Sequence, residues 1–346
     1  MTTLQVGEDG AVRDDGPTDE VPTDEVPTDE LMADAVAALR EGGLVAFPTE
    51  TVYGLGADAA NPDALRRLYA VKGRPATHPV IVHLGEPDHV DQWAVDVTEV
   101  AHRLARACWP GPLTLVLRRS RRVPDDVTGG RDTVGLRVPG HPMALRLLRE
   151  FGGGLAAPSA NRFGRVSPTT AADVRADLGG DVDLVLDGGA CSVGVESTIL
   201  DCTGLEPVIL RPGGVTRERV EEIVGRTVPV STDATGRAPG TLASHYAPRA
   251  RVVVVGSDAV AERAAACIDD GNRVGVLAEK GPDDLPAGVT LLEPPRDADD
   301  YARVLYARLR AADDESLDVL LAVPPAEMGV GTAVADRLRR AAGSPP

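Results

Sequence analysis

The stretch LVAFPTETVYGLGADAANPDALRRLYAVKGRP, residues 44–75, decides the fold. It begins with the apolar run 44–47, which is long enough for a short buried strand. Asn61 followed by Pro62 predicts the start of a helix, because asparagine caps a helix N-terminus and proline suits its first turn. Apolar side chains then recur at helical spacing through Tyr69. A strand that leads into a helix in this way is typical of an α/β domain.

The same alternation of short apolar runs and amphipathic stretches continues along the chain. We expect a mixed sheet rather than a purely parallel one, because the later runs follow one another at hairpin spacing. Predicted strands are 44–47, 80–84, 113–117, 133–138, 155–156, 182–186, 197–200 and 208–210, and predicted helices are 61–69, 98–108, 143–151 and 217–224, with an earlier helix ending at Gly42. A second run of β, α, β alternation begins at Arg251 and predicts a small open-sheet α/β domain.

Composition divides the chain of 346 residues into four parts. Residues 1–30 hold ten acidic side chains against one arginine and repeat the motif PTDE three times, which predicts a disordered acidic tail. Residues 31–228 form the first domain. Residues 229–249, rich in Ser, Thr, Gly, Pro and Ala, are expected to be a linker. Residues 250–346 form the second domain. A chain of this length is typical of two globular domains.

The net charge of −17 is unevenly distributed, since residues 31–230 hold 25 acidic and 22 basic side chains. A nucleotide ligand is therefore compatible with the first domain. No apolar stretch is long enough to span a membrane and the N-terminus is acidic, so we expect a cytoplasmic protein without a membrane partner. The four cysteines are far apart and form no C-x-x-C pair, which argues against a disulfide framework and a thiolate zinc site.

Gly54, Gly56 and Ala59 satisfy the letters of the dinucleotide fingerprint G-x-G-x-x-A. That fingerprint also needs an acidic residue about 20 positions later, where this chain has basic residues instead. The dehydrogenase interpretation is therefore weak. A tight turn rich in hydroxyl groups explains the glycines at least as well.

Lys72 and Arg74 flank Gly73 directly after the first predicted helix of the opening stretch. The chain has only two lysines, Lys72 and Lys280, so a lysine here is not its usual choice of cation. A lysine point charge beside an arginine fork suits a phosphate or another anion. A solvated surface turn is the alternative.

The small residues of APSAN, 157–161, allow a ligand to approach the backbone closely. Ser159, Asn161 and Ser167 offer uncharged hydrogen bonds, and plain helix caps are the alternative. Ser159 lacks the G-x-S-x-G elbow of a hydrolase nucleophile. His83, on the predicted strand 80–84, shares a face with Ile81, where a hydrogen-bonded, half-buried histidine is the usual case.

Eight motifs occur in the order FPTETVYGLG, VKGRP, PVIVHL, WPGPLTLVL, TVGLRVP, APSAN, VESTI and ILRPG. Together they resemble the YrdC-like domain of threonylcarbamoyl-AMP synthases. PGTLASHYAP and the ending GVGTAVADRL resemble the longer, two-domain form of that family. The resemblance spans residues 31–343. It implies a YrdC-like twisted mixed-sheet catalytic domain followed by a small Rossmann-like domain.

The resemblance also implies a reaction that joins L-threonine, bicarbonate and ATP into L-threonylcarbamoyl-AMP and releases pyrophosphate. The signature K-x-R…S-x-N of the active site falls on Lys72, Arg74, Ser159 and Asn161. Residues that match the threonine pocket are Thr51, His83, Arg137, Ser197 and the backbone at Ala157. Residues that match the ATP contacts are Arg74, His78, Thr133, Ser159, Ser167, Arg211 and Tyr246, with His78 at a position where the family more often has asparagine.

Further expectations concern cofactor and partners. No metal-ligand motif is present, so we expect magnesium to arrive with the phosphates of ATP. The resemblance implies a separate transferase that uses the product to modify certain tRNAs, and it leaves room for a weak direct contact with tRNA. The linker, including Tyr246, is expected to be a lid over the ATP site, and the second domain is expected to be non-catalytic. For Arg137, bracing of the sheet through Asp132 is the alternative role.

Two other interpretations belong to different classes. An RNA-binding module without catalysis would use Arg118, Arg119, Arg121 and Arg122 as a phosphate patch. The domain lacks the interleaved aromatic residues that bind single strands, and such a run of arginines is most often a solvated loop. A sugar- or nucleotide-binding regulatory domain without turnover is the other alternative.

Overall fold

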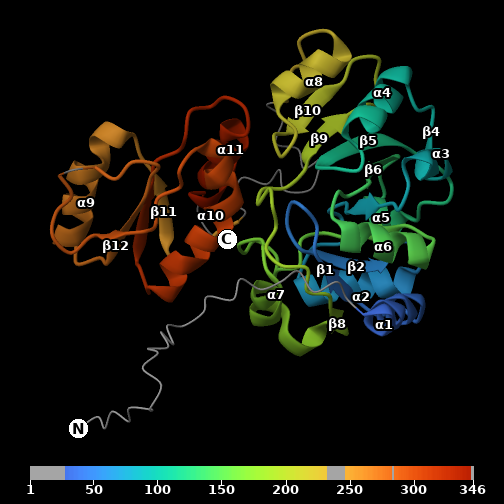
Figure 1. Cartoon of the computed structure of the whole chain (residues 1–346), viewed down its shortest axis with the longest axis horizontal. Helices are drawn as coiled ribbons and strands as arrows, with labels where there is room; N and C mark the ends of the chain where they lie inside the picture. The colour runs from blue at the N-terminus through green and yellow to red at the C-terminus, as the bar shows by residue number, and fades with distance from the viewer. Residues whose placement is uncertain (1–27, 232–245, 283, 344–346) are drawn as a thin grey trace, which may run out of the picture.

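The computed structural model describes residues 28–231, 246–282 and 284–343. Two α/β domains lie side by side, and Figure 1 shows the larger one in blue to yellow and the smaller one in orange to red. Most of the predicted acidic tail and the centre of the predicted linker lie outside the described residues. Within those three ranges, no helix is both long and apolar enough to cross a membrane.

The larger domain is built on a ten-stranded sheet in which β4 pairs with β5 and the other strands follow the order β10-β9-β5-β6-β3-β7-β2-β1-β8. The strand bounds are β1 Val45–Phe47, β2 Gly54–Asp58, β3 Ile81–His83, β4 Ala94–Val95, β5 Leu113–Arg119, β6 Thr133–Arg137, β7 Leu155–Ala156, β8 Leu184–Val185, β9 Thr198–Asp201 and β10 Val208–Arg211. Parallel pairs such as β3 with β6 occur beside antiparallel pairs such as β5 with β6, which confirms the predicted mixed sheet.

Helices cover both faces of this sheet. Their bounds are α1 Asp29–Arg40, α2 Pro62–Lys72, α3 Val90–Trp93, α4 Glu99–Cys108, α5 Asp125–Thr128, α6 Pro142–Phe151, α7 Ala171–Leu178 and α8 Arg217–Val224, with 3₁₀ turns at Pro87–His89 and Gly179–Asp181. Val45 and Phe47 of β1 pack with α1 and α6, whereas Ala46 joins the larger core cluster with α2, α4, α7 and α8. The alternation of side chains along the strand explains this division.

The glycines of the opening stretch lie in a strand, so the tight-turn interpretation is wrong. β2 runs antiparallel to β1, with Leu55 opposite Ala46. A Cβ atom at Gly56 would lie 2.8 Å from the ring of Phe47, so glycine makes room for that ring. The dinucleotide fingerprint needs its glycines at a strand-to-helix turn. This position in mid-strand therefore removes the basis of the dehydrogenase interpretation.

The sequence pattern also missed several short elements and placed one boundary too late. α1 begins at Asp29, inside the predicted tail, because the Thr28 side chain accepts a hydrogen bond from the amide of Leu31 and caps the helix. The elements β2, β4, α3, α5, α7 and β13 were not predicted. All six are short, with eight residues or fewer.

The smaller domain is a four-stranded parallel sheet in the order β11-β14-β12-β13. Its strands are β11 Arg251–Val254, β12 Val274–Leu277, β13 Thr290–Leu291 and β14 Val319–Ala322, and its helices are α9 Val260–Asp269, α10 Ala298–Asp314 and α11 Gly331–Ala341, after a 3₁₀ turn at Ser257–Ala259. All its strand pairs are parallel, as expected for an open-sheet α/β domain.

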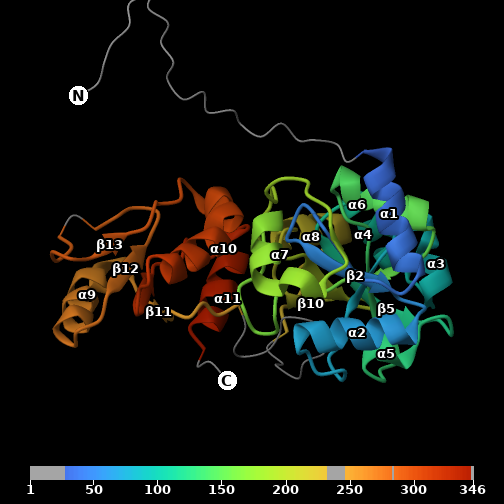
Figure 2. The same ribbon diagram turned by 90° about the horizontal axis from the view of Figure 1, so that it is seen from below.

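Helix α10 packs directly against the larger domain, and Figure 2 shows it beside α7. Arg310 of α10 donates to the carboxylate of Asp177 on α7 at 2.8 Å and to the carbonyl of Val166 at 2.7 Å. A Cβ atom at Gly194 would lie 2.4 Å from the carbonyl oxygen of Ala302, so the helix backbone lies against this loop. The two domains therefore share a packed interface.

Candidate active site

A cavity of about 60 Å³ lies where strands β3 and β6 meet irregular segments of the larger domain. Its lining consists of Thr49, Thr51, Val52, Gly54, Arg74, Val80, Ile81, His83, Arg137, Ala157, Pro158, Ser159, Glu196, Ser197, Arg211 and Tyr246. All five residues that match the threonine pocket lie in this lining. Of the residues that match the ATP contacts, Arg74, Ser159, Arg211 and Tyr246 lie there too. Three arginines with several hydroxyl groups make the cavity suitable for anions.

The side of the cavity formed by the sheet presents a histidine and an arginine together. β3 and β6 pair in parallel with His83 opposite Arg137, so both side chains extend from the same face. Nη2 of Arg137 donates to Oε1 of Glu50 at 2.6 Å. Asp132, which the sequence analysis considered as the brace for Arg137, instead pairs with Arg118 at 3.5 Å. Asp132 was therefore the wrong partner, but the expected pairing of Arg137 with a carboxylate is present and involves Glu50.

His83 is buried at the cavity wall with its ring edge-on to Phe47, at 6.2 Å between ring centres. Its Nδ1 atom has no hydrogen-bond partner in the described part of the chain. Burial, followed by the positive charge of Arg137, lowers the pKa of His83 to about 3. The ring is therefore neutral at physiological pH. A neutral ring nitrogen in this position is available to a polar ligand.

Hydroxyl groups line two other parts of the wall. The Thr49 hydroxyl donates to the carbonyl of Val52 at 2.6 Å and lies 2.8 Å from the Thr51 hydroxyl, which fixes the turn between β1 and β2. Across the cavity, the Ser197 hydroxyl lies 2.8 Å from that of Thr114 on β5. The hydroxyls of Thr51 and Ser197 are thus each held by a neighbouring hydroxyl group.

Two buried guanidinium groups supply positive charge. Arg211, at the end of β10, donates to the carbonyl of Ser197 at 2.8 Å. Arg74 follows α2, donates to the carbonyl of Pro79 at 2.8 Å and lies 5.8 Å from the ring centre of Phe163. Burial lowers the pKa of Arg74 to about 10 and also lowers that of Arg211. Both groups stay protonated at neutral pH.

The Lys72 ammonium group lies beneath APSAN, 157–161, and is not part of the cavity lining. Its Nζ donates to the carbonyls of Ser159 and Asn161, both at 2.5 Å. The residue is 2% exposed. Burial, followed by the charge of Arg74, lowers the pKa of Lys72 well below its usual value. In this arrangement the lysine holds the backbone that carries Ser159.

Asn161 and Ser167 also face the protein and do not line the cavity. The Asn161 amide donates to the carbonyls of Arg162 and Arg165, both at 2.8 Å. The Ser167 hydroxyl donates to Oε1 of Glu196 at 2.8 Å. Both side chains therefore shape the segment on this side of the cavity.

His78 and Thr133, the other two predicted ATP contacts outside the lining, lie farther along the surface. His78 is half-buried with its ring 5.7 Å from that of Phe163. Burial lowers the pKa of His78, and the charge of Arg74 adds to this shift. Thr133 begins β6, where it pairs with Arg118 of β5.

Two residues of the smaller domain reach the cavity wall, and the sequence analysis did not identify them. Nε of Arg337 donates to Oε2 of Glu196 at 2.7 Å, and the Tyr306 hydroxyl lies 2.8 Å from the same oxygen. The Tyr246 ring packs 5.6 Å from that of Tyr306 and 5.3 Å from the Arg337 guanidinium carbon. The sequence held one signal that could have indicated these contacts. Glu196, directly before Ser197 in the VESTI motif, is an acidic residue that needs a partner when buried.

The arginines of the alternative RNA patch are largely engaged within the protein. Arg118 is paired as described above, Arg119 pairs with Asp125 at 2.5 Å, and the Arg122 guanidinium carbon lies 5.4 Å from the ring centre of Trp93. Their charge is therefore partly used by neighbouring side chains. The structure gives the RNA-binding interpretation no specific support.

Both domains match protein families that are already described. Residues 37–213 match the family model described as "Telomere recombination", and residues 215–343 match "Threonylcarbamoyl-AMP synthase, C-terminal domain". The threonylcarbamoyl-AMP synthase of Pyrococcus abyssi is 43% identical over 321 residues, which cover 89% of this chain and 93% of the relative. The enzyme of the same name from Bacillus subtilis is 40% identical over 327 residues, which cover 89% and 92%.

The fold gives the same result. The crystal structure of P. abyssi Sua5 complexed with L-threonine matches with a TM-score of 0.84 and 41% identity, and the match covers 90% of this chain and 94% of that one. Sequence and fold thus agree over both domains. This chain belongs to the threonylcarbamoyl-AMP synthase family, in its two-domain form.

Proposed function

We propose that this chain is an L-threonylcarbamoyl-AMP synthase, a nucleotidyltransferase that condenses L-threonine, bicarbonate and ATP. The threonine amine first captures carbon dioxide from bicarbonate and forms a carbamate, with release of water. A carbamate oxygen then attacks the α-phosphorus of ATP. The new O–P bond forms as the bond to the β-phosphate oxygen breaks, and pyrophosphate leaves.

One observation supports this proposal above the others: the threonine-pocket residues and two buried arginines line a single cavity. The carbamate and the triphosphate are both anions, and they must meet for the reaction to occur. Such a step needs fixed positive charge and oriented donors more than a base that shuttles protons. Arg74 and Arg211 supply that charge, and Ser159 supplies a hydroxyl donor beside them.

The side formed by the sheet suits the amino acid. Arg137 offers a planar fork that matches a carboxylate, and Glu50 holds the fork in place. Thr51, Ser197 and the neutral ring of His83 are positioned for the remaining polar groups of threonine. The P. abyssi structure was solved with L-threonine bound, which supports the assignment of this substrate.

We assign Lys72 and Asn161 a positioning role in the signature segment. Lys72 holds the backbone of this segment through the carbonyls of Ser159 and Asn161. The Asn161 amide holds the turn that follows through the carbonyls of Arg162 and Arg165, and neither side chain lines the cavity. Ser159 lies between them in sequence and is the member of this set that faces the ligand space. In this arrangement Lys72 fixes the position of Ser159 and its neighbours, and these residues donate hydrogen bonds to ATP.

Magnesium in this proposal comes with ATP. The described residues hold no cluster of three or more His, Cys, Asp or Glu side chains placed to bind a metal. Glu196, the carboxylate of the cavity lining, is already engaged by Arg337. Glu50, which pairs with Arg137 of the lining, is engaged by that arginine and by the amide of Gly140. This donor set suits an ion held by phosphate oxygens. There it would offset the charge that develops on the departing pyrophosphate.

The remaining expectations stay predictions. They are the ATP contacts of His78 and Thr133, the cytoplasmic location, a weak contact with tRNA, and the separate transferase that would consume the product. The lid role of the linker also stays a prediction, because residues 232–245 lie outside the described residues. Its described end, Tyr246, is buried in the cavity wall.

Mass spectrometry of a reaction with L-threonine, bicarbonate, ATP and magnesium tests the proposal. We expect the mixed anhydride and pyrophosphate in equal amounts, and neither product when bicarbonate is omitted. Arg74→Ala should lose both products. Arg66→Ala is the matched control, because Arg66 lies on the exposed surface of α2 and pairs only locally with Asp63. Release of phosphate from ATP without the anhydride would contradict the proposal.

A further inference from the structure

Glu196 lies at the border between the two domains, and both of them hold its carboxylate. Ser167 of the larger domain donates to Oε1 at 2.8 Å. The Tyr306 hydroxyl of α10 lies 2.9 Å from Oε1 and 2.8 Å from Oε2. Arg337 of α11 donates from Nε to Oε2 at 2.7 Å. Most of the groups that fix this carboxylate therefore belong to the smaller domain.

The charge of Glu196 matters because the residue lines the same cavity as Arg211. Burial alone would raise the pKa of Glu196, but the positive charges of Arg337 and Arg211 outweigh it and hold the pKa at about 2. The carboxylate is therefore negative at physiological pH, in a site proposed to admit two anions. Arg337 is the cation that offsets this charge from outside the cavity.

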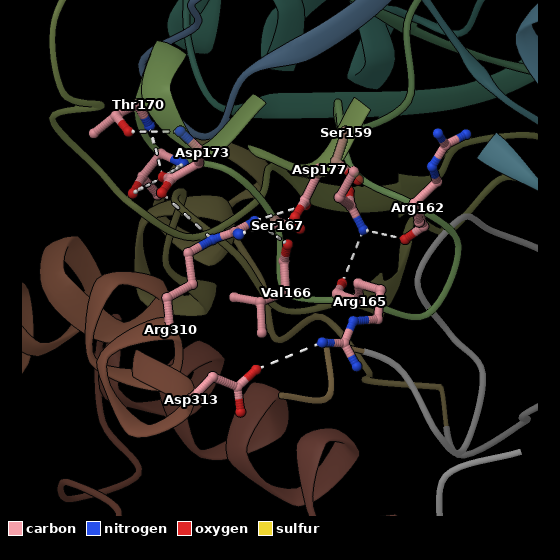
Figure 3. Close-up of polar contacts among 12 residues, drawn as sticks. Ser159, Arg162, Arg165, Val166, Ser167, Thr170, Asp173, Asp177, Arg310 and Asp313 are labelled. Carbon is pink, nitrogen blue, oxygen red and sulfur yellow. Dashed lines mark hydrogen bonds and ion pairs between the residues drawn. The ribbon is translucent and has the colours of Figure 1, made fainter. Parts of the chain in front are cut away.

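One face of α10 is fastened to the segment that carries Ser167. Tyr306, Arg310 and Asp313 are spaced by four and three residues, which places them on one side of the helix. Figure 3 shows Arg310 and Asp313 directed at the larger domain, where Arg310 donates to the carbonyl of Val166 at 2.7 Å. Asp313 pairs with Arg165 at 3.5 Å. These contacts fix the position of α10, and therefore of Tyr306, relative to Glu196.

Gly194 gives independent evidence that α10 packs closely against the loop before Glu196. Its φ of +76° is in the left-handed region, and an added Cβ atom would lie 2.4 Å from the carbonyl oxygen of Ala302. Only glycine satisfies both conditions without displacing the helix. This close approach lies two residues before Glu196 in the sequence, so any displacement of α10 would also reach the carboxylate.

We propose that the smaller domain belongs to the catalytic apparatus, with Tyr306 and Arg337 as positioning residues that hold Glu196 and offset its charge so that Arg211 stays available to the triphosphate. The inference rests on the proposed function and extends it to residues 110 and 141 positions away from Glu196. It replaces the expectation that the second domain has no part in the chemistry.

Loss of Arg337 would leave Glu196 negative, with Arg211 as the other cation whose charge acts on this carboxylate. The two would then pair, and the guanidinium group would be withdrawn from the nucleotide. Because hydrogen bonds to charged groups commonly change affinity by about 10- to 100-fold, we expect Arg337→Gln to raise the KM for ATP at least about tenfold. The KM for threonine should change less than about threefold, because Arg137 and His83 are supported by the sheet.

Steady-state pyrophosphate release at varied ATP and varied threonine tests the inference in the full chain. Tyr306→Phe is compared with Tyr301→Phe, because Tyr301 lies on the same helix and its hydroxyl donates to Val323 inside the smaller domain, at 3.2 Å. Arg337→Gln is compared with Arg339→Gln, because Arg339 lies on the same helix and pairs with a surface glutamate. We expect only Tyr306→Phe and Arg337→Gln to raise the KM for ATP.

The double variant Glu196→Gln/Arg337→Gln separates charge compensation from simple structural support. If the uncompensated carboxylate is the cause of the defect, removing both charges should return the KM for ATP to within about threefold of the wild-type value. No such rescue is expected if Arg337 merely holds the domains together. Should Arg337→Gln fail to fold, the comparison of Tyr306→Phe with Tyr301→Phe decides the question.

The outcomes distinguish this inference from the proposed function. A wild-type chain that forms no anhydride would reject the proposed function itself. An active wild-type chain whose Tyr306→Phe and Arg337→Gln variants match their controls would reject the inference alone. Equal rises in both KM values, or a double variant without recovery, would also overturn it.

Discussion

The two sides of the cavity are supported in different ways. On the side formed by the sheet, His83 and Arg137 are neighbours in the ladder between β3 and β6, and Glu50 braces the arginine from the turn between β1 and β2. On the other side, Ser159 and Glu196 lie on irregular segments that depend on a buried lysine and on the smaller domain. The comparison teaches that paired strands fix His83 and Arg137, which are proposed to hold threonine, whereas contacts remote in sequence fix Ser159 and Glu196 on the other side.

The largest expected effect tests whether the two sides are separate at all. Arg74→Ala should slow pyrophosphate release about 100- to 1,000-fold, because a preorganised cation is lost from the proposed nucleotide site. Threonine binding, measured by calorimetry, should stay within about threefold of the wild-type value. A comparable loss of threonine affinity would mean that the cavity does not divide in this way.

The reciprocal experiment changes a residue on the side formed by the sheet and measures its effect on threonine. Arg137→Gln removes the fork proposed for the threonine carboxylate, so the KM for threonine should rise about 10- to 100-fold with little change for ATP. Arg118→Gln on the neighbouring strand is the control, because Arg118 is exposed and pairs with Asp132. A rise that appears mainly in the KM for ATP would reverse the assignment of the two sides.

A comparison of two glycine variants tests the role of the domain interface. Gly194 and Gly225 both have positive φ, +76° and +81°, but an added Cβ atom meets α10 only at Gly194 and open space at Gly225. Both alanine variants should lose about 1 kcal/mol to backbone strain, and Gly194→Ala should lose about 1–3 kcal/mol more through the clash. Thermal unfolding gives the stabilities, and only Gly194→Ala should also weaken ATP use. Equal behaviour of the two variants would show that the close approach has no role.

The side formed by the sheet should also make the stability of the protein depend on acid. The pKa of His83 is lowered from 6.5 to about 3, so between these values the unfolded chain binds a proton that the folded chain does not. The unfolding free energy should therefore fall as the pH falls through this window, with a slope of up to about 1.4 kcal/mol per pH unit from this group. Denaturant unfolding of His83→Gln should lack this contribution. An unchanged slope would mean that the ring is not held neutral.

The sequence predicted those parts of the site that local periodicity places. Alternation along the strand 80–84 put His83 on the face opposite Val82, and the structure confirms this, with Val82 in the core and His83 at the cavity. The cap at Asn61 likewise marked the start of α2 correctly. A strand or helix pattern specifies which way a side chain points, so these residues needed no long-range information.

The parts that the sequence did not predict depend on tertiary contacts. The role of Glu50 requires knowing that the turn between β1 and β2 reaches Arg137 of β6. The roles of Tyr306 and Arg337 require knowing how the domains pack. Lys72 was expected to face the ligand, and the prediction that it contacts substrate is still untested. Its actual partners are two backbone carbonyls, and carbonyls leave no signature in a sequence.

The burial of Lys72 has a practical consequence for labelling. Among the two lysine side chains of the chain, Lys280 is exposed on the smaller domain, whereas Lys72 is 2% exposed. An amine-reactive dye should therefore modify Lys280 at a single side chain and provide a fluorescent reporter on that domain. Acylation of Lys72, detected by peptide mapping, would in turn show that the segment 157–161 opens and exposes the lysine to solvent.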